Sequence, residues 1–325
     1  MGSNHFLQRV TLFLKGIAMG AADVVPGVSG GTIAFVTGIY EELVSTIDKL
    51  SLSFFKDWKK DGLKTTWKAY NLNFLLVLGA GIAFSILSLA KLVTYAMEVY
   101  PIAVWSFFFG LILASVIYIG KQVKRWGLKE ILLGLAAAFV AYFITTLKPL
   151  AGTDSTYFFF IAGFFGIIAM ILPGVSGAFI LLLLGAYRPV LETLSKLTEG
   201  LRAMDMSIIL PAGSKIFVFC LGMLVGIKLF SRVLTMLLKN YKFSTLAILT
   251  GFMVGSLNKI WPWREVVSYR TNSKGEQVPF VENNILPSGF EGDPQVVVAV
   301  LFMVLGFMII FGLEYFASRK TKLVE

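Results

Sequence analysis

The chain has 325 residues, of which 57% are apolar and only 15% are charged, and its mean hydropathy is +0.79. Ordinary soluble domains carry about 25% charged residues, so most of this chain must face lipid. One cysteine, Cys220, and one histidine, His5, exclude a disulfide framework and a thiolate metal cluster, and they argue against chemistry that needs two imidazoles. The net charge of +10 is typical of cytoplasmic loops in a membrane protein, not of nucleic-acid binding.

Apolar runs of about 20 residues predict helices that cross the bilayer. In chain order these are 72–96, 100–119, 128–147, 214–238, 243–260 and 295–316. Two longer apolar blocks, 6–47 and 156–191, are each interrupted by Pro-Gly-Val-Ser-Gly. Because Pro-Gly ends a helix and Ser-Gly can start another, each block is predicted to form a helical hairpin. The sequence leaves open whether its legs are re-entrant or cross the membrane fully.

The charges of the loops predict the orientation. With the N-terminus in the cytoplasm, the inside segments hold 16 Lys and Arg residues and the outside segments hold six. The inside segments are 1–9, 48–71, 120–130, 239–242 and 317–325, and the outside segments are 97–99, 148–155, 192–206 and 261–294. The positive-inside rule therefore predicts a multi-pass plasma-membrane protein with both termini cytoplasmic. The polar stretch 261–294 is expected to be an extracytoplasmic loop.

The two interrupted blocks are copies of one another. Residues 26–50 and 173–197 align without gaps and are identical at 11 of 25 positions, including the whole Pro-Gly-Val-Ser-Gly motif. Each half is then a hairpin followed by three crossings, and this odd number starts the second half from the opposite face. We therefore predict an all-α integral membrane protein of two inverted-topology repeats, 1–147 and 148–325. Such repeats place a substrate site near the midplane, where broken helices meet.

The repeated motif offers groups that bind an anion. A broken helix leaves backbone N–H groups without partners, and the start of a helix carries partial positive charge. Serine hydroxyls can donate to a ligand, and glycines let a bulky anion approach the backbone. The predicted phosphate-binding residues of the motifs are Ser29, Gly30, Gly31, Thr32, Ser176 and Gly177. Because Phe179 replaces Thr32 in the second copy, the first cradle is predicted to be the more polar. The alternative interpretation is that the glycines only permit close packing.

Charges inside apolar segments are costly, so each is a candidate functional group. Asp23, three residues before Pro26, is predicted to bind a proton or cation, or to pair with Lys15 about two turns away on the same helix face. These two residues are the candidates for coupling to protons or sodium. Lys91 and Arg232 fall on one another in a weaker continuation of the repeat, and they are predicted to contact the phosphate. The alternative for the three cations is that they snorkel to the membrane surface.

The segments KGIAMGAADVVPGVSGGTIAFVTGIYEELV and LPGVSGAFILLLLGAY make the chain recognisable. It resembles a bacterial and archaeal family first catalogued as a domain of unknown function and now assigned as polyprenyl-phosphate transporters. The resemblance covers essentially the whole chain. It implies a flippase that moves undecaprenyl phosphate from the outer to the inner leaflet of the bacterial or archaeal plasma membrane, and so recycles the lipid carrier of cell-wall synthesis.

Two other functions compete with this interpretation. A channel or transporter for a small soluble anion would share the cradle and the repeat, but it would enclose a water-lined path with no opening to lipid. A membrane enzyme, such as a lipid pyrophosphate phosphatase, would need a nucleophile, a base and a cation cluster, and the single histidine disfavours it. The sequence predicts no cofactor, no metal, no catalytic residue and no nucleic-acid partner. It leaves open a homo-oligomer.

Overall fold

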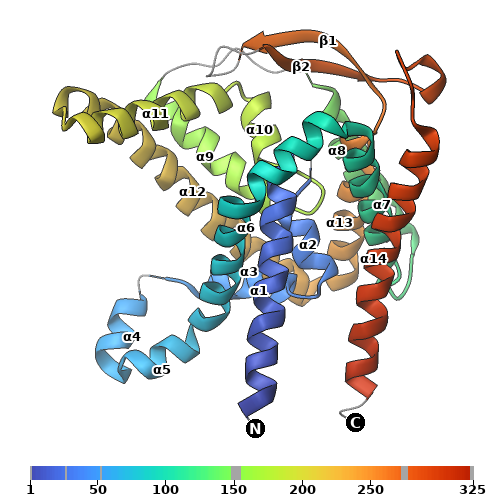
Figure 1. Ribbon diagram of the computed structural model, residues 1–325. Coiled ribbons are helices and arrows are strands. Elements are labelled where there is room, and N and C mark those ends of the chain that lie inside the picture. The colour runs from blue at the N-terminus through green and yellow to red at the C-terminus, as the bar shows by residue number, and fades with distance from the viewer. Residues whose placement is uncertain (1, 26–27, 52, 148–154, 272–276, 323–325) are drawn as a thin grey trace.

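The computed structural model describes residues 2–25, 28–51, 53–147, 155–271 and 277–322, with side chains for most of them. The chain is mostly helical (Figure 1). The first half contains α1 (Gly2–Val24), α2 (Gly30–Val36), α3 (Tyr40–Lys49), α4 (Ser53–Asp61), α5 (Leu63–Ala69), α6 (Leu72–Val99), α7 (Pro101–Gly120) and α8 (Leu128–Thr146). The second half contains α9 (Thr156–Ile171), α10 (Gly177–Leu183), α11 (Tyr187–Ala203), α12 (Met206–Asn240), α13 (Lys242–Ser256), η1 (Leu257–Ile260), β1 (Arg264–Thr271), β2 (Gln277–Asn284), η2 (Pro287–Gly289) and α14 (Val296–Lys322).

The long apolar runs form the long helices that the sequence predicts. Among the described residues, five helices are long and apolar enough to cross a membrane, or six if the bent pair α10 and α11 counts as one span. Four of the five agree with the predicted spans to within a few residues. The fifth, α12, begins at Met206, eight residues before the predicted span 214–238, because Asp205 caps it by accepting a hydrogen bond from the Ser207 N–H.

Each interrupted block forms a long helix, a break and a short helix. The short helices α2 and α10 have seven residues each. Seven residues rise about 10 Å, which is too little to cross a hydrocarbon core of about 30 Å. Neither short helix can therefore cross a membrane by itself, and α10 turns into α11 with a bend of 105°.

The helices pack in pairs through glycines. α1 packs on α6, α9 on α12, α7 on α14 and α8 on α13. A Cβ added at Gly81 of α6 would collide with the carbonyl of Phe13, and one added at Gly222 of α12 would collide with the carbonyl of Phe160. Backbone approach of this kind is what small residues permit between membrane helices. The buried core includes Ile112 of α7, and α7 contacts both α2 and α13, which also contribute to the core.

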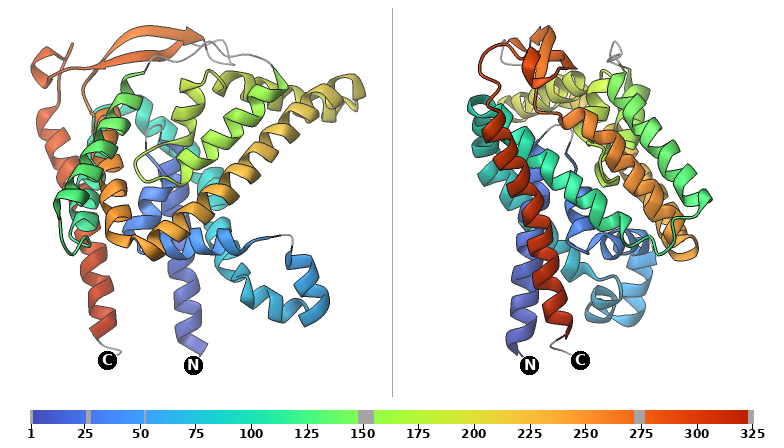
Figure 2. Two further views of the ribbon diagram at one scale, coloured as in Figure 1. Left: turned by 180° about the vertical axis from the view of Figure 1, so that it is seen from behind. Right: turned by 90° about the vertical axis from the view of Figure 1, so that its right-hand side faces the viewer.

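The stretch 261–294 is more ordered than a loop, and the chain is not all-α as predicted. β1 and β2 pair as an antiparallel hairpin, with a register irregularity between Val266 and Tyr269. This hairpin lies at the end of the molecule opposite the first turns of α1 and the last turns of α14, as both views of Figure 2 show. The predicted inside segment 48–71 also contains helices, α4 and α5, which project from the end that holds the termini (Figure 1).

Candidate functional site

The two Pro-Gly-Val-Ser-Gly breaks meet in the interior of the protein. Pro26 and Gly27 lie outside the described residues, but the rest of the first break contacts the second directly. The Ser29 hydroxyl lies 2.9 Å from the carbonyl oxygen of Met170 and 3.1 Å from that of Leu172, and it accepts a hydrogen bond from the Gly31 N–H. The Thr32 hydroxyl accepts a hydrogen bond from the Gly174 N–H at 2.9 Å. The polar side chains of the first break therefore hold the second break in place.

The glycines of the motifs lie against protein atoms. A Cβ added at Gly31 would collide with the carbonyl of Ile171, and one added at Gly177 would lie 2.7 Å from the carbonyl oxygen of Gly166. In this conformation the glycines serve close backbone packing, which is the alternative role that the sequence offered. Contact of an anion with Gly30, Gly31 or Gly177 stays a prediction, and it requires the atoms that now cover these glycines to move away.

Asp23 and Lys15 do not pair with each other; both contact α2. The Asp23 carboxylate accepts a hydrogen bond from the Gly30 N–H at 2.7 Å, at the first residue of α2. The Lys15 ammonium donates to the Thr37 carbonyl at 2.6 Å, at the other end. Each charge is thus opposite in sign to the partial charge of the helix end that it contacts. These contacts fix α2 against α1.

The second break borders a small cavity. Its lining residues come from α8, the break itself, α10 and the α13–η1 turn: Ala141, Ile144, Thr145, Gly174, Val175, Ser176, Phe179, Ser256 and Lys259. The cavity volume of about 10 Å³ is room for roughly one water molecule. The Ser176 side chain makes no hydrogen bond with the part of the chain that the structure describes. The Lys259 ammonium lies 4.9 Å from the centre of the Phe179 ring.

Lys259 is a candidate that the sequence analysis missed. It lies at the end of the predicted span 243–260, where a lysine usually reaches the membrane surface. In the structure it points inward, toward the second break. The sequence does contain one feature that indicates Lys259: it is a charged residue inside an apolar segment, and such residues are functional candidates.

The two cations predicted from the repeat are not brought to this cavity. Arg232 is exposed on α12 and does not line it. Lys91 lies in α6, but its side chain is outside the described residues. Their contact with phosphate stays a prediction.

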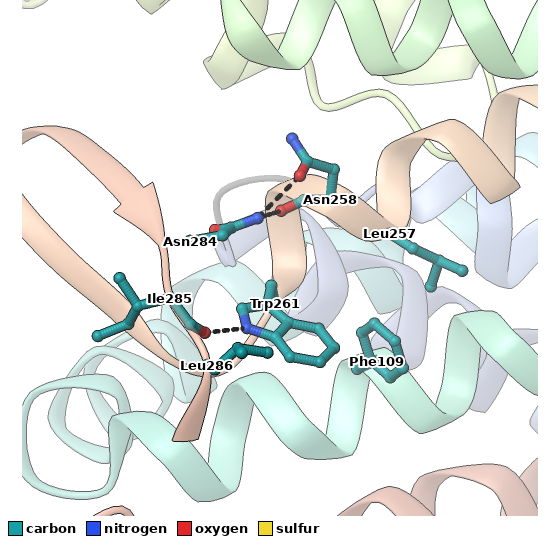
Figure 3. Close-up of a pocket in the computed structure, with 7 residues that line it drawn as sticks. All are labelled: Phe109, Leu257, Asn258, Trp261, Asn284, Ile285 and Leu286. Carbon is teal, nitrogen blue, oxygen red and sulfur yellow. Dashed lines mark hydrogen bonds between the residues drawn. The ribbon is translucent and has the colours of Figure 1, made fainter. Parts of the chain in front are cut away.

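A wider groove has Asn258 in its lining (Figure 3). It has a volume of about 400 Å³, and it is lined by Phe109, Leu257, Asn258, Trp261, Asn284, Ile285 and Leu286. The Trp261 indole donates to the Ile285 carbonyl at 2.8 Å and packs edge-on against Phe109. The Asn258 amide donates to the Thr145 hydroxyl at 2.7 Å, and Thr145 lines the small cavity. This hydrogen bond therefore lies between the groove and the cavity.

Arg264 fixes the turn that carries Lys259. Its guanidinium donates to the carbonyls of Lys259 at 2.6 Å and Trp261 at 2.8 Å, and to the Glu282 carboxylate at 3.1 Å. It also stacks 3.9 Å from the centre of the Trp105 ring. Burial lowers the pKa of Arg264, and the neighbouring Glu282 carboxylate opposes this shift. A guanidinium is planar, stays charged and presents several N–H donors, so it can donate to all three of these acceptors at once.

No group of three or more His, Cys, Asp or Glu that could hold a metal ion occurs within the described ranges. The site offers hydroxyls, one ammonium and backbone groups. Such groups can bind and neutralise an anion.

Known proteins resemble the chain along most of its length. A family model described as undecaprenyl phosphate translocase-like matches residues 19–278. The chain is 44% identical over 317 residues to a polyprenyl-phosphate transporter of Vibrio cholerae, covering 96% of this chain and 98% of that protein. It is 31% identical over 261 residues to a polyprenyl-phosphate transporter of Staphylococcus aureus, covering 77% of this chain and 85% of that protein. No solved structure matches it.

Proposed function

The chain belongs to the undecaprenyl phosphate translocase-like family, and on this basis we propose that it is a transporter that moves a polyprenyl phosphate across the membrane. It is a membrane transporter, not an enzyme. The observation that carries the proposal is the 44% identity to a polyprenyl-phosphate transporter over nearly the full length of both chains. The meeting of two broken helices supports it, because broken helices form the substrate sites of many transporters.

The substrate has a small anionic head and a long apolar tail, and the two parts have different requirements. The head must be neutralised where it crosses the hydrocarbon region, because an unpaired charge there is costly. The tail can stay in lipid. We propose that the head crosses at the junction of the breaks, where Ser29, Gly30, Gly31, Thr32, Ser176 and Gly177 gather, with Lys91 and Arg232 attracting it from the two faces. The structure then represents a closed state, in which hydrogen bonds between the breaks exclude the head.

We also propose that residues 1–147 and 148–325 are inverted repeats. Two observations support this. Helix pairing follows the repeat: the contact of α8 with α13 corresponds to that of α14 with α7. The glycine contacts correspond as well, since Gly16 and Gly81 join α1 to α6 as Gly163 and Gly222 join α9 to α12.

The orientation that we propose has both termini in the cytoplasm of a bacterial cell. The end that holds the termini also carries α4 and α5, with Lys56, Lys59, Lys60, Lys64 and Lys68. The opposite end carries the β-hairpin and α11 (Figure 1). This distribution supports the positive-inside assignment.

Coupling to protons or sodium remains a proposal for Asp23 and Lys15. Both residues contact the ends of α2, so a change in the charge of either would loosen the short helix of the first break. We propose that such a change accompanies the separation of the two breaks.

A transport assay tests the proposed function. Vesicles with a polyprenyl phosphate in both leaflets are prepared with and without the protein, and a phosphatase that cannot cross the membrane is added. Without the protein, the inner-leaflet half of the lipid should stay protected. With it, the protected half should be hydrolysed as it reaches the outer leaflet. Persistent protection would contradict the proposal, and release of trapped inorganic phosphate would favour a transporter of a small soluble anion.

A further inference from the structure

We propose that the second break is where the phosphate monoester binds, with the Ser176 hydroxyl and the Lys259 ammonium as its ligands and the Asn258 groove as the path of its isoprenoid chain. This inference rests on the proposed transport function. On the crossing path proposed above, it makes the second break the place where the headgroup rests in the bound state. The first break then holds the second in position, and Lys259 is the cation that contacts the bound headgroup.

The polar side chains of the first break are already engaged. Ser29 contacts two carbonyls at the end of α9, just before the second break, Thr32 accepts from the Gly174 N–H, and the Gly30 N–H donates to Asp23. An anion would have to replace each of these contacts. No such competition exists at Ser176, which is only 4% exposed and has no hydrogen-bond partner within the described residues.

The cavity beside the second break has two sets of polar side chains. Thr145 donates to the Tyr142 carbonyl and accepts from Asn258, and Ser256 donates to the Met253 carbonyl. These hydroxyls are satisfied. Ser176 and Lys259 are the lining side chains whose donors have no hydrogen-bond acceptor in the described part of the chain.

Lys259 lacks a counterion at contact distance. The Glu282 carboxylate forms its ion pair with Arg264 at 3.1 Å, and no carboxylate of the described residues lies within 4.0 Å of the Lys259 ammonium. Its aromatic neighbour Phe179 stabilises a cation without neutralising it. A cation inside an apolar segment ordinarily pairs or marks a ligand path. A phosphate monoester would supply both the missing counterion and an acceptor for Ser176.

The groove gives this anion a route. The cavity holds about one water, so a phosphate can enter only when the cavity opens. Asn258 lines the groove of about 400 Å³ (Figure 3). Its amide donates to the hydroxyl of Thr145, which lines the cavity, so we place the entrance at this hydrogen bond. Apolar side chains line most of the groove, namely Phe109, Leu257, Trp261, Ile285 and Leu286. This apolar lining suits the first isoprene units of the tail. The groove reaches Asn258, where the head would enter the cavity.

Binding measurements on the full-length protein in detergent test the inference. The probes are farnesyl phosphate, farnesol and inorganic phosphate, and the variants are Ser176→Ala, Lys259→Gln and Lys259→Arg. The control is Lys239→Gln, which removes an exposed lysine at the end of α12 that does not line the cavity. Thermal unfolding of each variant is measured in parallel.

We expect Ser176→Ala to weaken farnesyl phosphate binding roughly tenfold and Lys259→Gln to weaken it more, because each removes a donor to a charged group. Lys259→Arg should keep most of the affinity, and Lys239→Gln all of it. Ser176→Ala should not lower the unfolding temperature, because its hydroxyl has no hydrogen bond to lose. Farnesol should bind weakly, because it lacks the charge, and inorganic phosphate weakly, because it lacks the tail.

The outcomes distinguish the proposed binding site from the proposed transport function. Wild-type affinity for farnesyl phosphate in both Ser176→Ala and Lys259→Gln would overturn the site assignment and leave the transport function intact. Absence of farnesyl phosphate binding by the wild-type protein, together with absence of transport, would overturn both. Inorganic phosphate binding as tightly as farnesyl phosphate would overturn the assignment to a lipid headgroup and assign the site to a soluble anion.

Discussion

The hydroxyl of Thr32 accepts a hydrogen bond from the backbone N–H of Gly174, a residue 142 positions further along the chain. The contact joins the short helix of the first break to the turn of the second. Gly174 has φ +86°, a conformation that suits glycine, so the N–H points in a direction that an ordinary residue at this position would not favour. The two breaks are therefore packed as one unit in this structure.

Removing this acceptor should destabilise the protein. Thr32→Val keeps the shape of the side chain but leaves the Gly174 N–H buried without a partner, at a cost of about 1–3 kcal/mol. We expect its thermal unfolding temperature to fall measurably below that of the wild-type protein. Thr32→Ser, which keeps the hydroxyl, is the matched control and should stay close to wild type. Equal unfolding temperatures for Thr32→Val and Thr32→Ser would argue against the contact.

Gly81 tests the packing of α1 on α6. Gly81→Ala places a methyl group against the carbonyl of Phe13, and overpacking of this kind costs about 1–3 kcal/mol. Gly222→Ala should have a similar effect, because its methyl meets the carbonyl of Phe160. Gly79→Ala is the control in the same helix: its Cβ meets no atom within 4 Å, so it should be neutral or slightly stabilising. Similar unfolding temperatures for all three variants would contradict the pairing.

Asp23 should act on stability through the Gly30 N–H. Asp23→Ala removes the acceptor, and we expect a loss of about 1–3 kcal/mol. Asp23→Asn keeps an oxygen acceptor without the charge and should be intermediate. If Asp23 also couples transport to protons, an imposed proton gradient should change the transport rate of the wild-type protein but not that of Asp23→Asn. An equal response to the gradient in both would remove Asp23 as the coupling residue.

Arg264 should be required for the geometry of the η1 turn. Arg264→Lys keeps a positive charge but cannot supply the planar fork of donors to Lys259, Trp261 and Glu282. We expect a lower unfolding temperature and slower transport. Arg202→Gln, at an exposed position on α11, serves as the control and should leave the unfolding temperature unchanged. Retention of wild-type stability by Arg264→Lys would show that charge alone suffices.

The orientation can be checked by labelling. In a Cys220→Ser background, an impermeant maleimide added to intact cells should label Glu291→Cys, near the β-hairpin, and not Lys60→Cys in α4. After permeabilisation both should react. The reverse pattern would invert the proposed topology.

The sequence predicts the long helices well because the length of an apolar run can be recognised from neighbouring residues alone. The spans, the two breaks and their position at equivalent places all follow from patterns within about 25 residues. The β-hairpin does not follow from such local patterns, because β1 and β2 have eight residues each and pair through an irregular register. Short strands of this kind carry little alternation to distinguish them from a loop.

The candidate site is predictable only in part. The motif copies identify Ser29 and Ser176 as equivalent residues, and the sequence alone gives them equal roles. The structure gives them different surroundings, because Ser29 contacts the carbonyls of Met170 and Leu172 while Ser176 faces a cavity. Which hydroxyl is engaged depends on tertiary contacts between distant segments. For the same reason, the sequence predicts that Lys259 lies at the membrane surface. Only the tertiary structure shows that its ammonium lies beside the Phe179 ring.

The guanidinium of Arg264 connects the β-hairpin to the Lys259 backbone, since one side chain donates hydrogen bonds to Glu282 of β2 and to the Lys259 carbonyl of the η1 turn. An antibody or small cyclic peptide that clamps the hairpin would therefore restrain that turn from outside the cell, in the proposed orientation. Inhibitors acting in this way would not need to enter the bilayer.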